Sequence, residues 1–145
     1  MKKLLVTTLV LLAINAQAES VFRRSNGSEP KSIDPQLATE NAGSAIIYDN
    51  FEGLTTTNAK GEVIPGVAEK WEVSDDGKIY TFHLRDNAKW SNGEPVTADD
   101  FVYAWQRAVN PATGGEYAFI LYPVKNAEAI ASGQEKHLEA LGIKA

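Results

Sequence analysis

Cysteine is absent from this chain of 145 residues, so the chain forms no disulfide and has no thiol nucleophile. The same absence removes the residue that would carry a lipid anchor after a secretory leader. Histidine is scarce, because only His83 and His137 occur, and neither has further ligands at metal spacing. We therefore expect no metal site, no lipid anchor and no cofactor.

The motifs of common hydrolases and nucleotide-binding enzymes are also missing. No serine lies in a Gly-x-Ser-x-Gly pattern, and no glycine-rich phosphate loop occurs. Adjacent carboxylates occur at Asp75-Asp76 and at Asp99-Asp100, but sequence neighbours point apart and suit turns or helix caps. The sequence predicts no catalytic residue and a protein that is not an enzyme.

Residues 1–18 contain the three regions of a secretory signal peptide in order. A charged start at residues 2–3 precedes an apolar core over 4–14 and a small-residue site over 16–18. The apolar core is too short for a permanent membrane span. We predict cleavage between Ala18 and Glu19 and a periplasmic location for the mature chain.

Basic charge is in deficit. Removal of the leader deletes two lysines and no acid, which moves the net charge from −5 to −7. A negative chain is repelled by phosphate backbones and anionic lipid surfaces, which argues against nucleic acid or a membrane surface as partner.

The strongest local pattern lies between residues 66 and 111, which contain all three tryptophans. Apolar segments at 71–73 and 79–84 flank Asp75-Asp76-Gly77, a composition typical of a hairpin turn. Residues 80, 82 and 84 are apolar and alternate with polar ones, which predicts one packed face and one wet face. We expect Trp71 in the core.

A helix should follow this hairpin. Thr97 is a suitable N-cap, and the acids after it favour the positive end of a helix. Apolar side chains recur at 101, 104, 105 and 108, which forms one stripe, and Pro111 should end the helix. We predict that Trp105 lies in the core and that the stripe covers the hairpin, with Trp90 in the core or anchoring a loop.

The remaining segments have weaker patterns, and together they predict a mixed α+β chain. We expect a strand at 20–25, a turn at 26–30, a loop or edge strand at 37–41, a helix at 42–51 ended by Gly53, a hairpin of 54–57 with 62–64, a loop at 112–115, a short aromatic segment at 117–122, a helix at 125–131 and helical turns at 135–141.

Several motifs of the chain resemble those of the extracytoplasmic peptide-binding proteins of ABC importers, solute-binding family 5, and in particular the oligopeptide subgroup. The motifs are Asn26-Gly27-Ser28-Glu29-Pro30, Asp34-Pro35, Phe51-Glu52-Gly53-Leu54, Pro65-Gly66-Val67-Ala68 and the run from Tyr80 to Trp105. The resemblance extends over nearly all of residues 21–145.

This resemblance implies the N-terminal portion of a two-lobed periplasmic-binding-protein-like fold, with β-hairpins covered by helices in an extra domain. Residues 19–50 would start the first lobe, and 51–145 would form most of the extra domain. These residues contain no counterpart of the rest of the first lobe or of the second lobe. In the family, the second lobe holds the acidic anchor for the peptide α-amino group. The chain is therefore expected to be the front part of a longer protein.

The resemblance also implies contacts with the backbone of a peptide ligand. A short strand of the first lobe that pairs with peptide aligns with Thr39, Glu40 and Asn41, and a tyrosine of the extra domain aligns with Tyr117. The implied function is a monomeric receptor that binds peptides and delivers them to the membrane permease subunits of an ABC transporter. The alternatives are an orphan periplasmic sensing or interaction module and a non-functional truncated fragment.

Overall fold

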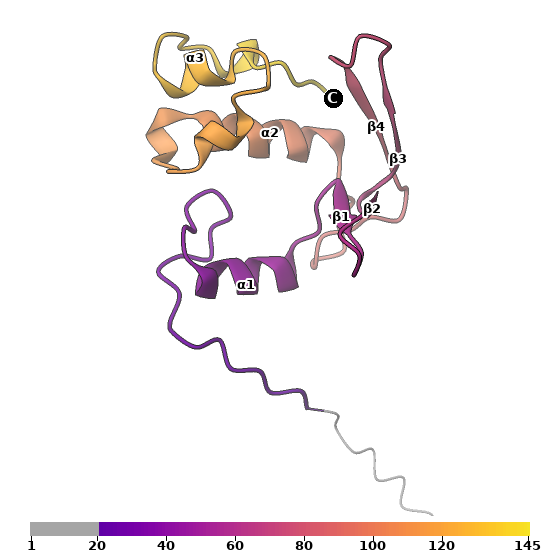
Figure 1. Ribbon diagram of the computed structural model, residues 1–145, viewed down its shortest axis with the longest axis vertical. Coiled ribbons are helices and arrows are strands. Elements are labelled where there is room, and N and C mark those ends of the chain that lie inside the picture. The colour runs from indigo at the N-terminus through magenta and orange to yellow at the C-terminus, as the bar shows by residue number, and fades with distance from the viewer. Residues whose placement is uncertain (1–20) are drawn as a thin grey trace, which may run out of the picture.

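The computed structural model describes residues 21–145, so the predicted leader and its cleavage site lie outside the described residues. Helices α2 and α3 lie together at one end, α1 lies apart from them, and the hairpin β3–β4 stands at the side (Figure 1). This is the mixed α+β class that the sequence predicts. The elements are α1 (Asn41–Asn50), β1 (Thr55–Thr57), β2 (Val63–Pro65), β3 (Ala68–Val73), β4 (Tyr80–Leu84), α2 (Ala98–Val109), the 3-10 turns η1 (Pro111–Thr113) and η2 (Ala118–Leu121), α3 (Ala127–Ala131) and the 3-10 turn η3 (Leu138–Ala140).

Both predicted hairpins are confirmed. β1 pairs antiparallel with β2, and β3 pairs antiparallel with β4, with Trp71 opposite Phe82. At the tip of the second hairpin Gly77 has a φ of +70°, and its amide donates to the Ser74 carbonyl at 2.8 Å. Glycine adopts this left-handed conformation without steric cost, which is why it marks the turn in the sequence.

The predicted packed face of this hairpin is only partly buried. Phe82 and Leu84 are half-buried, and the ring centroids of Trp71 and Phe82 lie 6.5 Å apart. Tyr80, on the same face, is 57% exposed, and Trp71 is half-buried rather than in the core. The alternation therefore predicted the strand pairing correctly but overstated the burial.

Helix α2 begins and ends where the sequence predicts. The amide and the hydroxyl of Thr97 both donate to the Asp100 carboxylate, at 2.7 and 2.9 Å. These bonds favour the ionised form and hold the pKa of Asp100 below its ordinary value. Pro111 starts the turn η1, directly after the helix.

The prediction that the stripe of α2 covers the hairpin is wrong. Helix α2 packs against η1, η2 and α3, and Trp105 contacts a buried cluster of Val109, Ala127, Ile130 and Leu141. After Pro111 the chain turns back and brings this cluster onto α2. A two-stranded ribbon offers a much narrower apolar face, so packing of the half-buried Trp105 against the helices removes more surface from water.

Three smaller expectations are corrected. The described part of the predicted strand at 20–25 has no regular structure. The helix predicted to run to Phe51 ends one residue earlier, where the Phe51 amide caps it by donating to the Ile47 carbonyl at 2.9 Å. Trp90 is 42% exposed, so it is not a core residue, but its indole donates to the Asp100 carboxylate at 3.4 Å, which agrees with the alternative that it anchors a loop. Within residues 21–145, every helix is too short or too polar to cross a membrane.

Candidate functional site

The loop that precedes α1 lies against residues of α2 and η2 that come more than seventy positions later in the chain. Both terminal nitrogens of Arg107 donate to the Asp34 carboxylate, at 2.7 and 2.5 Å. The same guanidinium also donates to the side-chain oxygen of Gln36. Such a forked contact fixes orientation as well as distance, so it holds the loop in one position on α2.

The hydrogen bonds between Asp34 and Arg107 keep both groups charged. Hydrogen bonds from Arg107 hold the pKa of Asp34 below its ordinary value, and the amide of Gln36 adds to that shift. The pKa of Arg107 is raised by the same bonds to Asp34. Both groups are therefore charged at neutral pH.

A close approach of two backbones supports the same arrangement. A Cβ atom on Gly115 would lie 2.8 Å from the Gln36 carbonyl oxygen, which is too close for any side chain. Glycine at this position lets the segment before η2 reach the loop. The sequence gives no reason to single out Gly115 or Arg107, because the partners of both are distant in the chain.

Two of the four residues expected to contact peptide meet at this junction. The Tyr117 hydroxyl donates to the Thr39 carbonyl at 3.3 Å, and its ring packs edge-on against Phe119 with centroids 5.9 Å apart. Tyr117 is 49% exposed. After donating its proton the phenolic oxygen can still accept a hydrogen bond, and the Thr39 carbonyl retains a second lone pair.

The strand expected over Thr39, Glu40 and Asn41 is not formed. Asn41 is the first residue of α1, and Glu40 is its N-cap in an extended conformation. The Glu40 carboxylate accepts from the amides of Gly43 and Lys31, at 2.9 and 3.1 Å, which lowers the pKa of Glu40. Glutamate is an uncommon N-cap, and the sequence pattern predicted the start of this helix at residue 42, one residue late.

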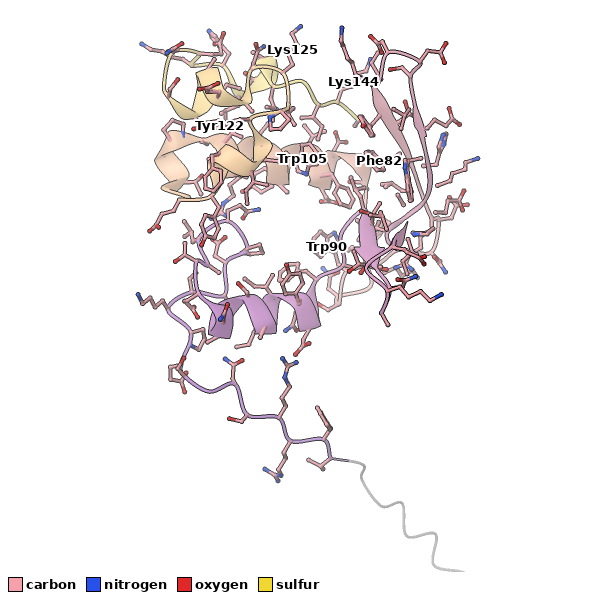
Figure 2. All side chains as sticks on the ribbon, in the orientation of Figure 1. Phe82, Trp90, Trp105, Tyr122, Lys125 and Lys144 are labelled. Carbon is pink, nitrogen blue, oxygen red and sulfur yellow. The ribbon has the colours of Figure 1, made fainter. Side chains whose placement is uncertain are left out.

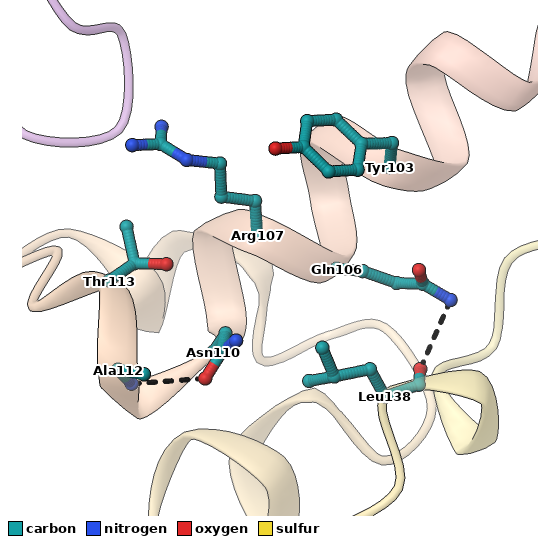
Figure 3. A pocket seen from close by; sticks show the side chains of 7 residues that line it. All are labelled: Tyr103, Gln106, Arg107, Asn110, Ala112, Thr113 and Leu138. Carbon is teal, nitrogen blue, oxygen red and sulfur yellow. Dashed lines mark hydrogen bonds between the residues drawn. The ribbon is translucent and has the colours of Figure 1, made fainter.

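A small hollow of about 390 Å³ lies beside Arg107, at the end of α2 (Figure 3). Gln106 donates from its side-chain amide to the Leu138 carbonyl at 3.3 Å, and the Ala112 amide donates to the Asn110 side chain at 3.0 Å. These bonds fasten η1 and η3 to α2. Three polar side chains that line the hollow, those of Gln106, Arg107 and Asn110, therefore have structural partners already.

The remaining titratable clusters are sparse. The Nε2 atom of His83 lies 3.3 Å from Glu72 on the neighbouring strand, and both side chains are substantially exposed. Among residues 21–145 no group of three or more His, Cys, Asp or Glu side chains is arranged to hold a metal ion.

Comparison with known proteins assigns the family. Residues 62–142 match the family described as bacterial extracellular solute-binding proteins, family 5 middle. The chain belongs to this family. The matched region runs from β2 through η3 and includes all of the helical cluster around Trp105.

Relatives of this family 5 chain include proteins that are named for different ligands. It is 46% identical over 129 residues to the probable deoxycholate-binding periplasmic protein YgiS of Escherichia coli, covering 88% of this chain and 24% of YgiS. It is 49% identical over 119 residues to the periplasmic murein peptide-binding protein MppA of Escherichia coli, covering 81% of this chain and 22% of MppA.

The fold agrees with a solved member. The crystal structure of Haemophilus influenzae OppA in complex with RPPGFSPFR aligns with a TM-score of 0.77 at 46% identity. The alignment covers 83% of this chain and 24% of that chain. The 145 residues thus span about a quarter of the length of the relatives they match.

Proposed function

We propose that this chain supplies one wall of the peptide-binding site of an extracytoplasmic receptor, which delivers peptides to the permease subunits of an ABC importer. The observation that carries the proposal is the contact of the Tyr117 hydroxyl with the Thr39 carbonyl. It joins two segments that the resemblance implicates separately in contact with peptide. The similarity to an OppA crystallised with a peptide supports the same ligand class.

The groups at this junction suit recognition of a backbone. The phenolic oxygen of Tyr117 can accept from a peptide N–H, and the free lone pair of the Thr39 carbonyl can do the same. Glu40 would contribute through its main chain, because its carboxylate already accepts from the amides of Gly43 and Lys31, and Asn41 would contribute through its main chain as well. Main-chain contacts are common to all peptides, so this wall would bind without strong side-chain preference.

The division into domains is part of the proposal. We assign residues 19–50 to the start of the first lobe and residues 51–145 to most of the extra domain beside it. The forked contact of Asp34 with Arg107 crosses this boundary and would hold the two parts together. The rest of the first lobe and the second lobe correspond to the three-quarters of the relatives that this chain does not match.

Periplasmic location and processing follow from the predicted leader. We propose that the mature protein starts at Glu19 and acts as a monomer. N-terminal sequencing of the exported protein should begin at Glu19, and a sequence that still begins at Met1 would contradict the leader assignment.

A bile acid is the second candidate ligand, because the relative YgiS is named as a probable deoxycholate-binding protein. A steroid has few hydrogen-bonding groups and would gain little from the carbonyl of Thr39 or the hydroxyl of Tyr117. Backbone-directed groups at the junction therefore favour peptide. Catalysis has no support in the residues described, and the family comprises solute-binding proteins.

A chimera tests the ligand class. Residues 21–145 replace the matching region of Haemophilus influenzae OppA, and binding of RPPGFSPFR and of deoxycholate is measured by isothermal titration. We expect peptide binding that Tyr117→Phe weakens by roughly twofold to tenfold, since one hydrogen bond contributes about 0.5–1.5 kcal/mol.

Tyr122→Phe is the matched control, because Tyr122 is a comparably exposed tyrosine at the other end of η2. This control should leave the affinity unchanged. A folded chimera that binds deoxycholate and not peptide would refute the proposed ligand class. Equal effects of the two tyrosine changes would refute the role of Tyr117.

A further inference from the structure

Exposed apolar side chains are concentrated around the 3-10 turn η2. Four of the residues between positions 117 and 122 are large, apolar or aromatic and largely in contact with water: Tyr117 is 49% exposed, Phe119 56%, Ile120 65% and Tyr122 40%. Single exposed apolar residues are ordinary on a protein surface. A contiguous group of them is typical of a surface that contacts another molecule.

This group lies on a fixed part of the backbone. The amide of Ile120 donates to the Tyr117 carbonyl at 3.1 Å, and the amide of Tyr122 donates to the Phe119 carbonyl at 3.2 Å. Leu121, from the same turn, packs against the buried cluster of α2 and α3. The exposed rings are therefore held in place by a turn whose other face is part of the core.

The β3–β4 hairpin does not cover these side chains. Figure 2 shows Tyr122, directly after η2, and Phe82 of β4 on opposite sides of Trp105. The elements that pack against η2 are α2 and α3. In the described part of the chain, the outer face of η2 is thus in contact with solvent.

Phe119 is the member of this group that is connected to the proposed peptide contact. Its ring meets the ring of Tyr117 edge-on, with centroids 5.9 Å apart and an interplanar angle of 89°. The hydroxyl of the same tyrosine donates to the Thr39 carbonyl at 3.3 Å. One tyrosine ring therefore joins the polar junction to the exposed phenylalanine, and a ligand bound at the junction meets an apolar surface beside it.

Most charges around the junction are compensated within the chain. Asp34 pairs with Arg107, and the charge of Lys31 acts on the Glu40 carboxylate, which also accepts backbone amides. Glu116 is exposed and is in no ion pair of the described residues. This carboxylate next to Tyr117 disfavours an acidic ligand side chain, since like charges repel, but it does not oppose an apolar one.

An extended peptide at the junction would direct only some of its side chains toward η2. Successive side chains of an extended backbone point to opposite sides, so neighbours of the bound residue point away from the ring pair. In recognition by backbone pairing, the main-chain bonds supply affinity and the surfaces met by alternate side chains supply specificity. The exposed ring of Phe119 is such a surface.

We propose that Phe119 is a specificity-determining residue, which favours an aromatic or aliphatic side chain at the ligand position beside the Tyr117 contact. This inference rests on the proposed function and adds a substrate preference to it. The main-chain contacts discriminate little among peptides, so the preference is confined to one ligand position. Contact between two aromatic rings should raise the affinity roughly twofold to tenfold.

The test uses the chimera in which residues 21–145 replace the matching region of Haemophilus influenzae OppA. The ligands are analogues of RPPGFSPFR, in matched pairs that carry phenylalanine or serine at one position at a time. Isothermal titration gives the ratio of the two affinities at each position. We expect one position at which phenylalanine is preferred and at which Phe119→Ala abolishes the preference, while the ratios at all other positions stay the same.

Three further variants sharpen the result. Ile120→Ala, at a residue of the same turn that is 65% exposed, is the matched control and should leave every ratio unchanged. Phe119→Leu keeps an apolar surface and should retain part of the preference. Tyr117→Phe should weaken all analogues by the same factor, because it removes a contact with the ligand backbone.

The outcomes separate this inference from the proposed function. Equal losses of affinity for all analogues in Phe119→Ala would show that the ring only supports Tyr117. Unchanged affinities with a lower thermal midpoint of the chimera would show that another part of the receptor covers the ring. Either result, or an equal effect of Ile120→Ala, overturns the role in specificity and leaves the proposed function intact. A folded chimera that binds none of the analogues overturns the proposed function, and this inference with it.

Discussion

The helical cluster and the β3–β4 hairpin are both regular, but they differ sharply in burial. Val109 and Ile130 in the cluster are each 1% exposed, whereas Ile79 and Tyr80 of the hairpin are mostly in contact with water. The hairpin has a regular antiparallel ladder between β3 and β4, yet few of its side chains are covered. Backbone regularity and hydrophobic burial are thus separate in this molecule, and we expect stability to reside mainly in the helices.

The difference also explains how the proposed site is positioned. The cluster fixes α2, and α2 carries Arg107, which holds the loop at Asp34. The hydroxyl of Tyr117 then reaches Thr39 in that loop. The hairpin makes no contribution to this chain of contacts.

The largest effect is expected in the cluster. Ile130→Ala should lower the free energy of unfolding by about 2–5 kcal/mol, because a buried isoleucine is removed and a cavity remains. The matched change in the hairpin is Ile79→Ala, which should cost less than about 1 kcal/mol at an exposed position. Urea unfolding of both variants measures the difference, and equal midpoints would contradict the unequal burial of the two regions.

The helix start should have an intermediate effect. Thr97→Ala removes the hydroxyl that donates to Asp100, and loss of an N-cap costs about 0.5–2 kcal/mol. Thr81→Ala, in the exposed part of β4, is the control for loss of a threonine outside the cap. If Thr81→Ala lowers the stability measured by thermal unfolding as much as Thr97→Ala does, the capping contact does not stabilise α2.

The smallest effect should appear as a pH dependence. The lowered pKa of Asp34 contributes stability that is fully present above the ordinary aspartate value of about 3.9 and is lost as the pH falls through the lowered value. Wild type should therefore be more stable than Asp34→Asn at pH 7, and the two should converge in acid.

Chemical unfolding from pH 7 to pH 2 measures this difference in the free energy of unfolding between wild type and Asp34→Asn. Asp75→Asn in the exposed hairpin turn is the control, since Asp75 is in no ion pair of the described residues. A gap between wild type and Asp34→Asn that stays constant into acid would show that the ion pair with Arg107 is not its source.

Local signals in the sequence were sufficient for most elements. Asp75-Asp76-Gly77, Thr97 and Pro111 specify turns and helix ends through nearby atoms, and the structure agrees at each of them. The partner of the α2 stripe could not be read in this way. Trp105 has one apolar face, and only the path of the chain after Pro111 decides what covers it.

The candidate site shows the same limit. The resemblance to the family pointed to Thr39 and Tyr117, and the structure brings them together. It did not reveal that Glu40 caps α1 or that Arg107 binds Asp34, because both depend on contacts formed only in the folded chain. In place of the predicted strand, Thr39 lies in a loop, Glu40 is the extended N-cap of α1 and Asn41 is its first residue.

Hydrogen exchange of wild type and Trp105→Ala tests most directly whether α2 belongs to the helical cluster and not to the hairpin. We predict that amides of β3–β4 exchange sooner than those of α2 in wild type. The substitution should speed exchange in α2, α3 and η3 and leave the hairpin amides unchanged, because Trp105 packs on that cluster. Faster exchange in β3–β4 of the variant, with α3 unchanged, would contradict the account and restore the hairpin as the partner of Trp105.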